Sequence, residues 1–139
     1  MTPSDIDIAD TPLSTRDEGC EPLLSVKNLR TEFDMSEGTL LAVDDVSFEV
    51  QRGEIFSIVG ESGSGKTVTA MSIMGLIAPP GKIVSGAVHF DGQDLRSLSE
   101  RDLRAIRGSE ISMIFQDAMT ALNPVYSIGD QVGEPLRRH

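Results

Sequence analysis

Hydrophobic and polar residues alternate in three stretches of the chain, and each stretch predicts a β-strand. Leu23–Phe33 and Leu40–Val50 have this alternation and are separated by a polar turn in which Gly38 can adopt a positive φ. A shorter stretch, Ser85–Asp91, ends in an Asp-Gly turn. We therefore expect two strands separated by a turn and a further short strand.

Two further short stretches are almost continuously apolar and do not alternate. Glu54–Val59 and Ile111–Phe115 lack a regular polar face. Strands that are covered on both faces, as in the parallel sheets of α/β proteins, have this composition. The sequence therefore predicts two buried strands at these positions.

Three stretches are typical of helices. Lys66–Ile77 has helical length and is followed by two prolines, which end a helix. Ser99–Ile106 begins with a serine suited to cap a helix, and Asp102 stands at the reciprocal position of a capping box. Ser127–Arg138 has the pattern of the beginning of a third helix.

Charge and composition separate the first 22 residues from the rest. Residues 1–22 carry six acids against one arginine and show almost no hydrophobic periodicity, which is typical of a disordered, solvated tail. Residues 23–139 carry all the predicted elements, and the last helical pattern still runs at His139. We expect these residues to be the N-terminal part of an incomplete domain. Such a chain should be poorly stable or prone to aggregation, because strand edges stay exposed.

The overall composition argues against several classes of protein. A net charge of −10 disfavours binding to nucleic acid, since the phosphate backbone is bound chiefly by Lys and Arg. No apolar run approaches the roughly 20 residues that span a bilayer. A single cysteine, Cys20, allows no internal disulfide, so a reducing, cytosolic setting is expected.

A glycine-rich loop between the first buried run and the first helix carries the clearest chemistry. It fits G-x-x-x-x-G-K-[ST] at every fixed position, and its residues are Gly60, Glu61, Ser62, Gly63, Ser64, Gly65, Lys66 and Thr67. Glycines let backbone N–H groups converge on a phosphate, and the following helix adds the positive end of its dipole. Lys66 can reach the outer phosphates and the Thr67 hydroxyl can ligate Mg²⁺. The dinucleotide pattern G-x-G-x-x-G does not fit, because Val68 stands at its last position.

Recognisable sequence segments also lie on both sides of this loop. The segments AVDDVSFEVQRGEIFSIVGESGSGKT and ISMIFQDAMTALNP, with VKNLRTEF and SGAVHFDGQDL, resemble the start of an ABC-transporter ATPase subunit. The resemblance covers residues 23–139 and is strongest to the oligopeptide and dipeptide importers, although Ala118 stands where that branch commonly has proline. It implies an α/β fold, a partial P-loop NTPase of ABC type with an antiparallel β subdomain and the start of the helical subdomain.

The resemblance implies roles for two residues outside the loop. Phe33 would stack on adenine; the alternative is a core aromatic at the end of a strand. Gln116 would lie beside the γ-phosphate and, with Thr67, would ligate the metal; the alternative is an exposed loop residue. ATP and Mg²⁺ are the ligands that follow from the resemblance.

The family also implies partners. Two ATPase subunits would pair, as a homodimer or a heterodimer, on membrane-spanning permease subunits at the cytoplasmic face of the cell membrane. The apolar loop after Gln116, with Met119, Leu122, Pro124 and Val125, either receives a permease helix or covers the chain's own core. The transported solute would be a peptide or a similar small molecule.

Several groups that an ABC ATPase uses for hydrolysis do not occur in this sequence: the LSGGQ-type signature, the apolar strand ending in Asp, the catalytic Glu after it and the switch His. The chain thus has a phosphate clamp without the groups that activate water. It is either the truncated ATP-binding subunit of a peptide importer, or a non-hydrolysing truncated or split-gene remnant that binds ATP weakly or not at all. A different P-loop protein, such as a small-molecule kinase or a GTPase, is a third reading, although the guanine motif N-K-x-D is absent.

Overall fold

The computed structural model describes residues 21–116 and 122–138. The chain forms two compact units, the first ending at Ser97 and the second beginning at Leu98. Each unit is described by itself. The acidic tail, residues 1–22, lies almost wholly outside the described residues, so its predicted disorder stays a prediction.

The first unit is built on an antiparallel sheet of four strands. The first two predicted strands, β1 (Leu24–Met35) and β2 (Gly38–Val50), pair as an antiparallel hairpin, and β3 (Gly81–Phe90) pairs with the other edge of β1. The short β4 (Gln93–Asp94) completes the order β2-β1-β3-β4. The third strand starts four residues before the predicted Ser85, because Gly81, Lys82 and Ile83 also pair with β1.

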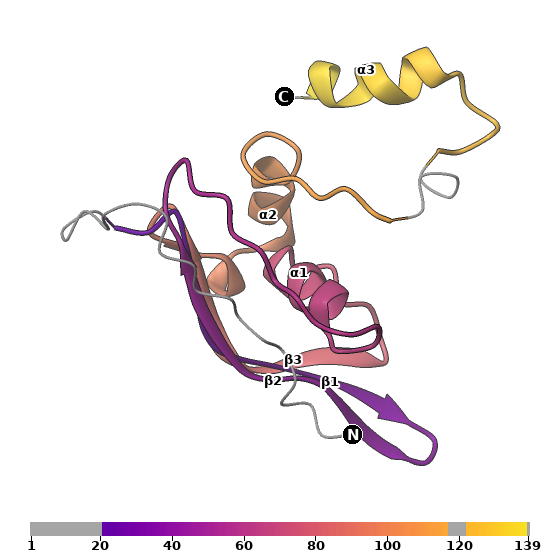
Figure 1. Cartoon of the computed structure of the whole chain (residues 1–139). Helices are drawn as coiled ribbons and strands as arrows, with labels where there is room; N and C mark the ends of the chain where they lie inside the picture. Colours follow the sequence, from indigo (N-terminus) through magenta and orange to yellow (C-terminus); the bar gives the residue numbers. More distant parts are fainter. Residues whose placement is uncertain (1–20, 117–121, 139) are drawn as a thin grey trace. The chain divides into compact units, whose positions relative to one another are not determined.

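Helix α1 (Lys66–Ile73) follows the glycine-rich loop and lies against the sheet (Figure 1). The Ser72 hydroxyl donates its only proton to the Val68 carbonyl oxygen at 2.7 Å, so the Thr31 hydroxyl must donate to Ser72 Oγ, 2.8 Å away. Both side chains are essentially inaccessible to solvent. This buried contact joins α1 to β1. Apolar side chains complete the core beside it: Val26, Leu29, Val43, Val88, Ile73 and Met74.

The helix ends earlier than the predicted Ile77, because Gly75 adopts a left-handed conformation with φ of 64°. The Leu76 N–H donates to the Met71 carbonyl at 2.8 Å, and the Gly75 N–H donates to the Ser72 carbonyl at 3.1 Å. These are the two bonds of a Schellman motif, which terminates helices at glycine. Ile77 therefore lies in the connection to β3.

Three neighbouring strands are irregular at the same level of the sheet. Asn28 in β1 and Asp45 in β2 have left-handed φ values of 49° and 54°, and the Asn28 amide donates to the Asp45 carboxylate at 2.7 Å. Gly86 in β3, with φ of 96°, approaches the Asn28 backbone so closely that an added Cβ would lie 2.6 Å from its carbonyl oxygen. Bulges of this kind bend a sheet, and the strands are visibly curved in Figure 1.

The prediction of two buried strands at residues 54–59 and 111–115 is wrong for this chain. Residues 54–58 and 112–115 have no strand conformation, and the side chains of Ile55 and Ile114 are 95% and 97% exposed. Extended segments become strands only when neighbours satisfy their backbone groups, and neither segment joins the four-stranded sheet. In the first segment, Phe56 stacks on Phe48 with ring centroids 4.9 Å apart, and the Glu54 N–H donates to the Gln51 carbonyl at 3.2 Å.

The second unit contains two capped helices. α2 (Glu100–Ile106) begins at the predicted Ser99, whose hydroxyl accepts from the Asp102 N–H at 3.3 Å. α3 (Ile128–Arg138) begins in the same way, because the Ser127 hydroxyl accepts from the Asp130 N–H at 3.1 Å. A short 3-10 turn, Leu95–Ser97, closes the first unit just before them.

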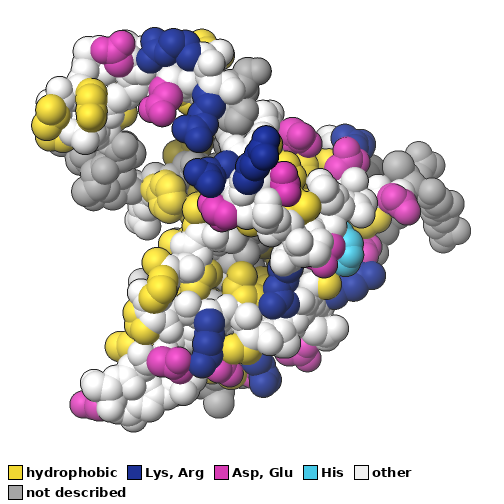
Figure 2. All heavy atoms as spheres, turned by 180° about the vertical axis from the view of Figure 1, so that it is seen from behind, with side chains coloured by type: hydrophobic (Ala, Val, Ile, Leu, Met, Phe, Trp, Pro, Cys, Tyr) yellow, Lys and Arg dark blue, Asp and Glu magenta, His cyan; other side chains and the backbone are white. Residues whose placement is uncertain are grey.

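Helix α3 carries an exposed apolar stripe. Ile128, Val132 and Leu136 recur every four residues, on one side of the helix, and each is at least 64% exposed. Hydrophobic side chains are accordingly visible at the surface of this segment, at the upper left of Figure 2. None of the helices within the described residues is long and apolar enough to cross a membrane.

We expect Ser72→Ala to destabilise the first unit more than Thr31→Val. Ser72→Ala leaves the Thr31 hydroxyl buried without an acceptor, which costs about 1–3 kcal/mol. Thr31→Val has nearly the same shape and leaves Ser72 bonded to the Val68 carbonyl. Urea unfolding of both variants, followed by circular dichroism, measures the difference, and equal losses would contradict the assigned direction of the bond.

We also expect Gly86→Ala to reduce stability far more than Gly53→Ala. Both glycines have positive φ, 96° and 74°, so each alanine bears a conformational cost of about 1–2 kcal/mol. Only at Gly86 does the new Cβ also collide with backbone, whereas at Gly53 it meets nothing within 4 Å. Melting temperatures of the two variants isolate the steric contribution. Equal temperatures would show that the sheet relaxes around the added methyl group.

Candidate functional site

The glycine-rich loop, residues 60–65, is shaped by glycines in left-handed conformations. Gly63 and Gly65 have φ values of 84° and 96°, which other residues rarely adopt. The Ser64 N–H donates to the Glu61 carbonyl at 3.2 Å, and the Thr69 N–H donates to the Gly65 carbonyl at 2.8 Å. The first bond closes the loop and the second begins α1 at Gly65.

The ammonium group of Lys66 lies within this loop. It donates to the carbonyl oxygens of Gly60 and Glu61 at 2.8 Å and 2.7 Å, and to Ser64 Oγ at 3.3 Å. All three of its protons are therefore directed at loop oxygens. The loop and the first residue of the helix thus form one hydrogen-bonded unit around a positive charge.

The N-terminus of α1 is open to an anion. No side chain caps it, and its first turn contains no acidic residue. The unpaired N–H groups of a first turn carry roughly half a positive charge and favour anions. An added Cβ on Gly63 would meet nothing within 4 Å, so there is open space beside the loop backbone. Gly60, Glu61, Ser62 and Thr67 are exposed around it.

The two predicted site residues outside the loop lie in different units. Phe33 belongs to the first unit, where its ring is partly buried near the end of β1. Gln116 belongs to the second unit and is exposed, so of the predicted site only the loop, the start of α1 and Phe33 belong to the first unit. Of the apolar loop after Gln116, the described residues Leu122, Pro124 and Val125 are exposed, and Met119 lies outside the described residues.

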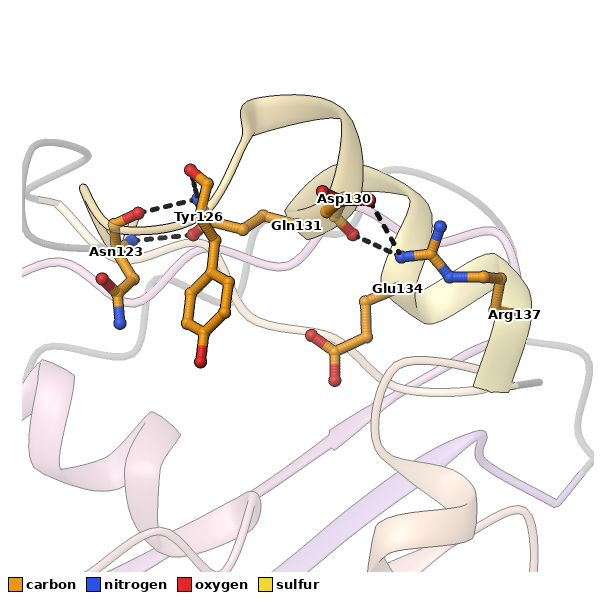
Figure 3. Close-up of a pocket in the computed structure, with 6 residues that line it drawn as sticks. All are labelled: Asn123, Tyr126, Asp130, Gln131, Glu134 and Arg137. Carbon is orange, nitrogen blue, oxygen red and sulfur yellow. Dashed lines mark hydrogen bonds and ion pairs between the residues drawn. The ribbon is translucent and has the colours of Figure 1, made fainter.

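A hollow of about 560 Å³ lies in the second unit, beside α3. Its lining residues are Asn123, Tyr126, Asp130, Gln131, Glu134 and Arg137. The Gln131 amide fastens the preceding loop to the helix by donating to two of the loop's carbonyls, at 2.9 Å and 3.0 Å. Figure 3 shows the Tyr126 ring and the Glu134 carboxylate extending toward the same side. Sequence reasoning does not indicate this hollow, because it arises from the folding of the loop onto α3.

The family model described as ABC transporter matches residues 43–138. The chain belongs to the ABC transporter family. This match includes the glycine-rich loop, Lys66 and Gln116. The expected α/β fold of ABC type, in partial form, is thereby confirmed.

Curated relatives of this ABC transporter chain have names that refer to peptide transport. A dipeptide transport ATP-binding protein of Bacillus subtilis is 54% identical over 120 residues, which cover 86% of this chain and 36% of that protein. The dipeptide transport ATP-binding protein of Escherichia coli is 46% identical over 84% of this chain. An oligopeptide transport ATP-binding protein of Bacillus subtilis is 49% identical over 84%. The chain spans 36% of the length of each of these relatives.

Solved structures with the same fold include the bacterial ABC transporter cassette MJ0796. The dimeric form matches with a TM-score of 0.72 and 30% identity, over 82% of this chain and 47% of that one. A post-hydrolysis dimer of the same cassette, bound to ADP and Pi, matches with a TM-score of 0.71. These matches confirm the partial cassette fold of this ABC transporter chain.

An ion pair stands next to Phe33 in the ABC transporter chain. Lys82 Nζ lies 2.9 Å from Asp34 Oδ2, and this hydrogen bond lowers the pKa of Asp34 below its ordinary value. The same bond raises the pKa of Lys82. Both side chains are about half exposed, so salt screens the pair.

We expect Lys82→Gln to raise the pKa of Asp34 toward its ordinary value. Because the folded-state pKa is depressed, the pair's contribution to stability is present above the unfolded-state pKa and is lost as the pH falls through the folded-state pKa. Titration of the Asp34 carboxyl by carbon NMR measures this change. Lys27→Gln, which removes a lysine on the same strand as Asp34, is the control. An unchanged Asp34 titration in Lys82→Gln would refute the assigned cause.

Proposed function

We propose that this chain binds Mg-ATP through residues 60–67, as the nucleotide-binding part of an ABC transporter that imports peptides or similar small solutes. One observation carries the binding proposal: the Lys66 ammonium lies inside the loop, on the Gly60 and Glu61 carbonyls, next to an uncapped helix N-terminus. Two sources of positive potential therefore converge at the same place.

The loop would bind phosphate by exchanging partners. Lys66 would leave neutral carbonyl oxygens for charged phosphate oxygens, and charge-assisted hydrogen bonds are roughly twice as strong as neutral ones. The loop N–H groups and the first turn of α1 would supply further donors. The glycines at 63 and 65 let the backbone approach the phosphates without a Cβ in the way.

The remaining predicted ligands would complete the nucleotide site. Thr67 is exposed in the first turn of α1, and its hydroxyl oxygen is a suitable ligand for Mg²⁺; the Gln116 side-chain oxygen would be a second. Bound Mg²⁺ would neutralise charge on the outer phosphates. Phe33, a partly exposed aromatic residue of the first unit, would stack on the adenine ring.

The setting of the whole protein is part of the proposal. The relatives' names support a peptide importer in which the ATP-binding subunit pairs with a second ATPase subunit, and the dimeric cassette MJ0796 supports such pairing. Permease subunits at the cytoplasmic face of the cell membrane would meet the loop after Gln116. The exposure of Leu122 and Val125, 46% and 83%, favours an apolar partner over a role in the chain's own core.

A non-hydrolysing remnant is the second candidate. The sequence lacks the signature motif, the catalytic Glu with its preceding strand and the switch His, so no residue is assigned to activate water. Glu61 is exposed on the loop, and Asp117 lies outside the described residues. This candidate predicts weak binding of ATP, or none, and no turnover.

We expect saturable binding of Mg-ATP by the purified chain and its loss in Lys66→Ala. Losing charge-assisted bonds to phosphate should weaken binding roughly 10- to 100-fold. Titration calorimetry measures binding, and phosphate release measures turnover. Lys27→Ala, an exposed lysine on β1, is the matched control and should bind like the unaltered chain.

Each result separates the candidates. Binding that depends on Lys66, without turnover, supports a working phosphate clamp in a catalytically incomplete chain. Turnover that depends on Lys66 would mean that the missing motifs are not required. Absence of Mg-ATP binding in the unaltered chain would refute the proposal and favour the remnant.

A further inference from the structure

The ring of Phe33 packs into the space where a side chain at position 81 would begin. Phe33 in β1 and Gly81 in β3 are register partners on adjacent strands. A Cβ on Gly81 would lie 2.6 Å from Phe33 Cε1 and 2.7 Å from Ile77 Cγ2. Carbon atoms in contact normally stay about 3.5–4.0 Å apart. Any residue other than glycine at this position must therefore displace the ring.

The backbone at Gly81 gives no other reason for a glycine. Gly81 is not among the glycines with positive φ. It lies in a paired β-strand, whose backbone conformation other residues adopt without strain. Glycine within a strand is less favourable than alanine by roughly 0.5–1 kcal/mol. The missing side chain is thus used for the close approach of the Phe33 ring.

The segment around the ring is held by backbone hydrogen bonds. The Asp34 N–H donates to the Pro80 carbonyl at 3.2 Å, and the Gly81 N–H donates to the Ala78 carbonyl at 2.9 Å. These bonds fasten the connection from α1 to the end of β1. The Cε1–Cδ1 side of the ring lies close to Gly81, and Phe33 as a whole is partly exposed.

A fixed, partly exposed aromatic ring is a surface on which a flat base can stack. Its orientation matters, because stacking requires parallel faces within a few ångströms. We propose that Gly81 is a positioning residue for nucleotide binding: by lacking a side chain, it orients the Phe33 ring for stacking on the base. This inference rests on the proposed function and adds a determinant of affinity for the base, separate from the phosphate loop.

The test compares a nucleotide with its phosphates alone. Mg-ATP and Mg-tripolyphosphate are titrated into the unaltered chain, Gly81→Ala and Phe33→Ala. Gly81→Ala should bind Mg-ATP roughly five- to hundredfold more weakly, the range for losing a base–aromatic stack, and should bind Mg-tripolyphosphate as before. Gly129→Ala is the control, because its φ is ordinary and its added Cβ would meet only Ser127 Oγ at 3.9 Å.

A double variant adds a second readout. If Gly81 acts only through the ring, then Phe33→Ala combined with Gly81→Ala should bind Mg-ATP no more weakly than Phe33→Ala alone. Equal weakening of both ligands in Gly81→Ala would mean a merely structural role and would overturn the inference. Unchanged Mg-ATP binding in Gly81→Ala or in Phe33→Ala would also overturn the inference about Gly81, but it would leave the proposed function unaffected. Failure of the unaltered chain to bind either ligand would overturn both.

Discussion

The buried hydrogen bond between Thr31 and Ser72 joins the helix of the first unit to its sheet. Ser72 lies on the helix that begins at the phosphate loop, and Thr31 lies on the central strand of a sheet. Neither hydroxyl reaches water, so the Thr31 hydroxyl requires Ser72 as its acceptor, while Ser72 also donates to the Val68 carbonyl. The bond therefore joins the helix that follows the glycine-rich loop to the strand that carries Phe33.

The glycine-rich loop is preorganised around Lys66. Three loop oxygens surround the Lys66 ammonium, so its positive charge is already at the mouth of α1 before any ligand arrives. An incoming triphosphate would replace neutral acceptors and would not have to order a mobile side chain. Phe33 is preorganised in the same way, because it contacts β3 and the segment after α1.

Much of this arrangement could be predicted from local sequence. The β1–β2 hairpin, the loop before α1, the cap at Ser99 and the family all follow from patterns spanning a few residues. The end of α1 could also have been predicted from Gly75, since glycine commonly terminates helices. Gly81 is different: nothing local indicates why it is a glycine, because the ring that needs its space comes from a strand 48 positions earlier in the chain.

The sequence by itself determined where the glycine-rich loop lies and which segments alternate to form the antiparallel sheet, because glycine conformations and two-residue periodicity are local properties. Only the tertiary structure decided what became of the apolar runs at 54–59 and 111–115. Hydrophobic residues make a segment fit for burial, but a strand forms only where neighbours accept its backbone hydrogen bonds. The sheet of this chain offers them none, so Ile55 and Ile114 remain in contact with solvent.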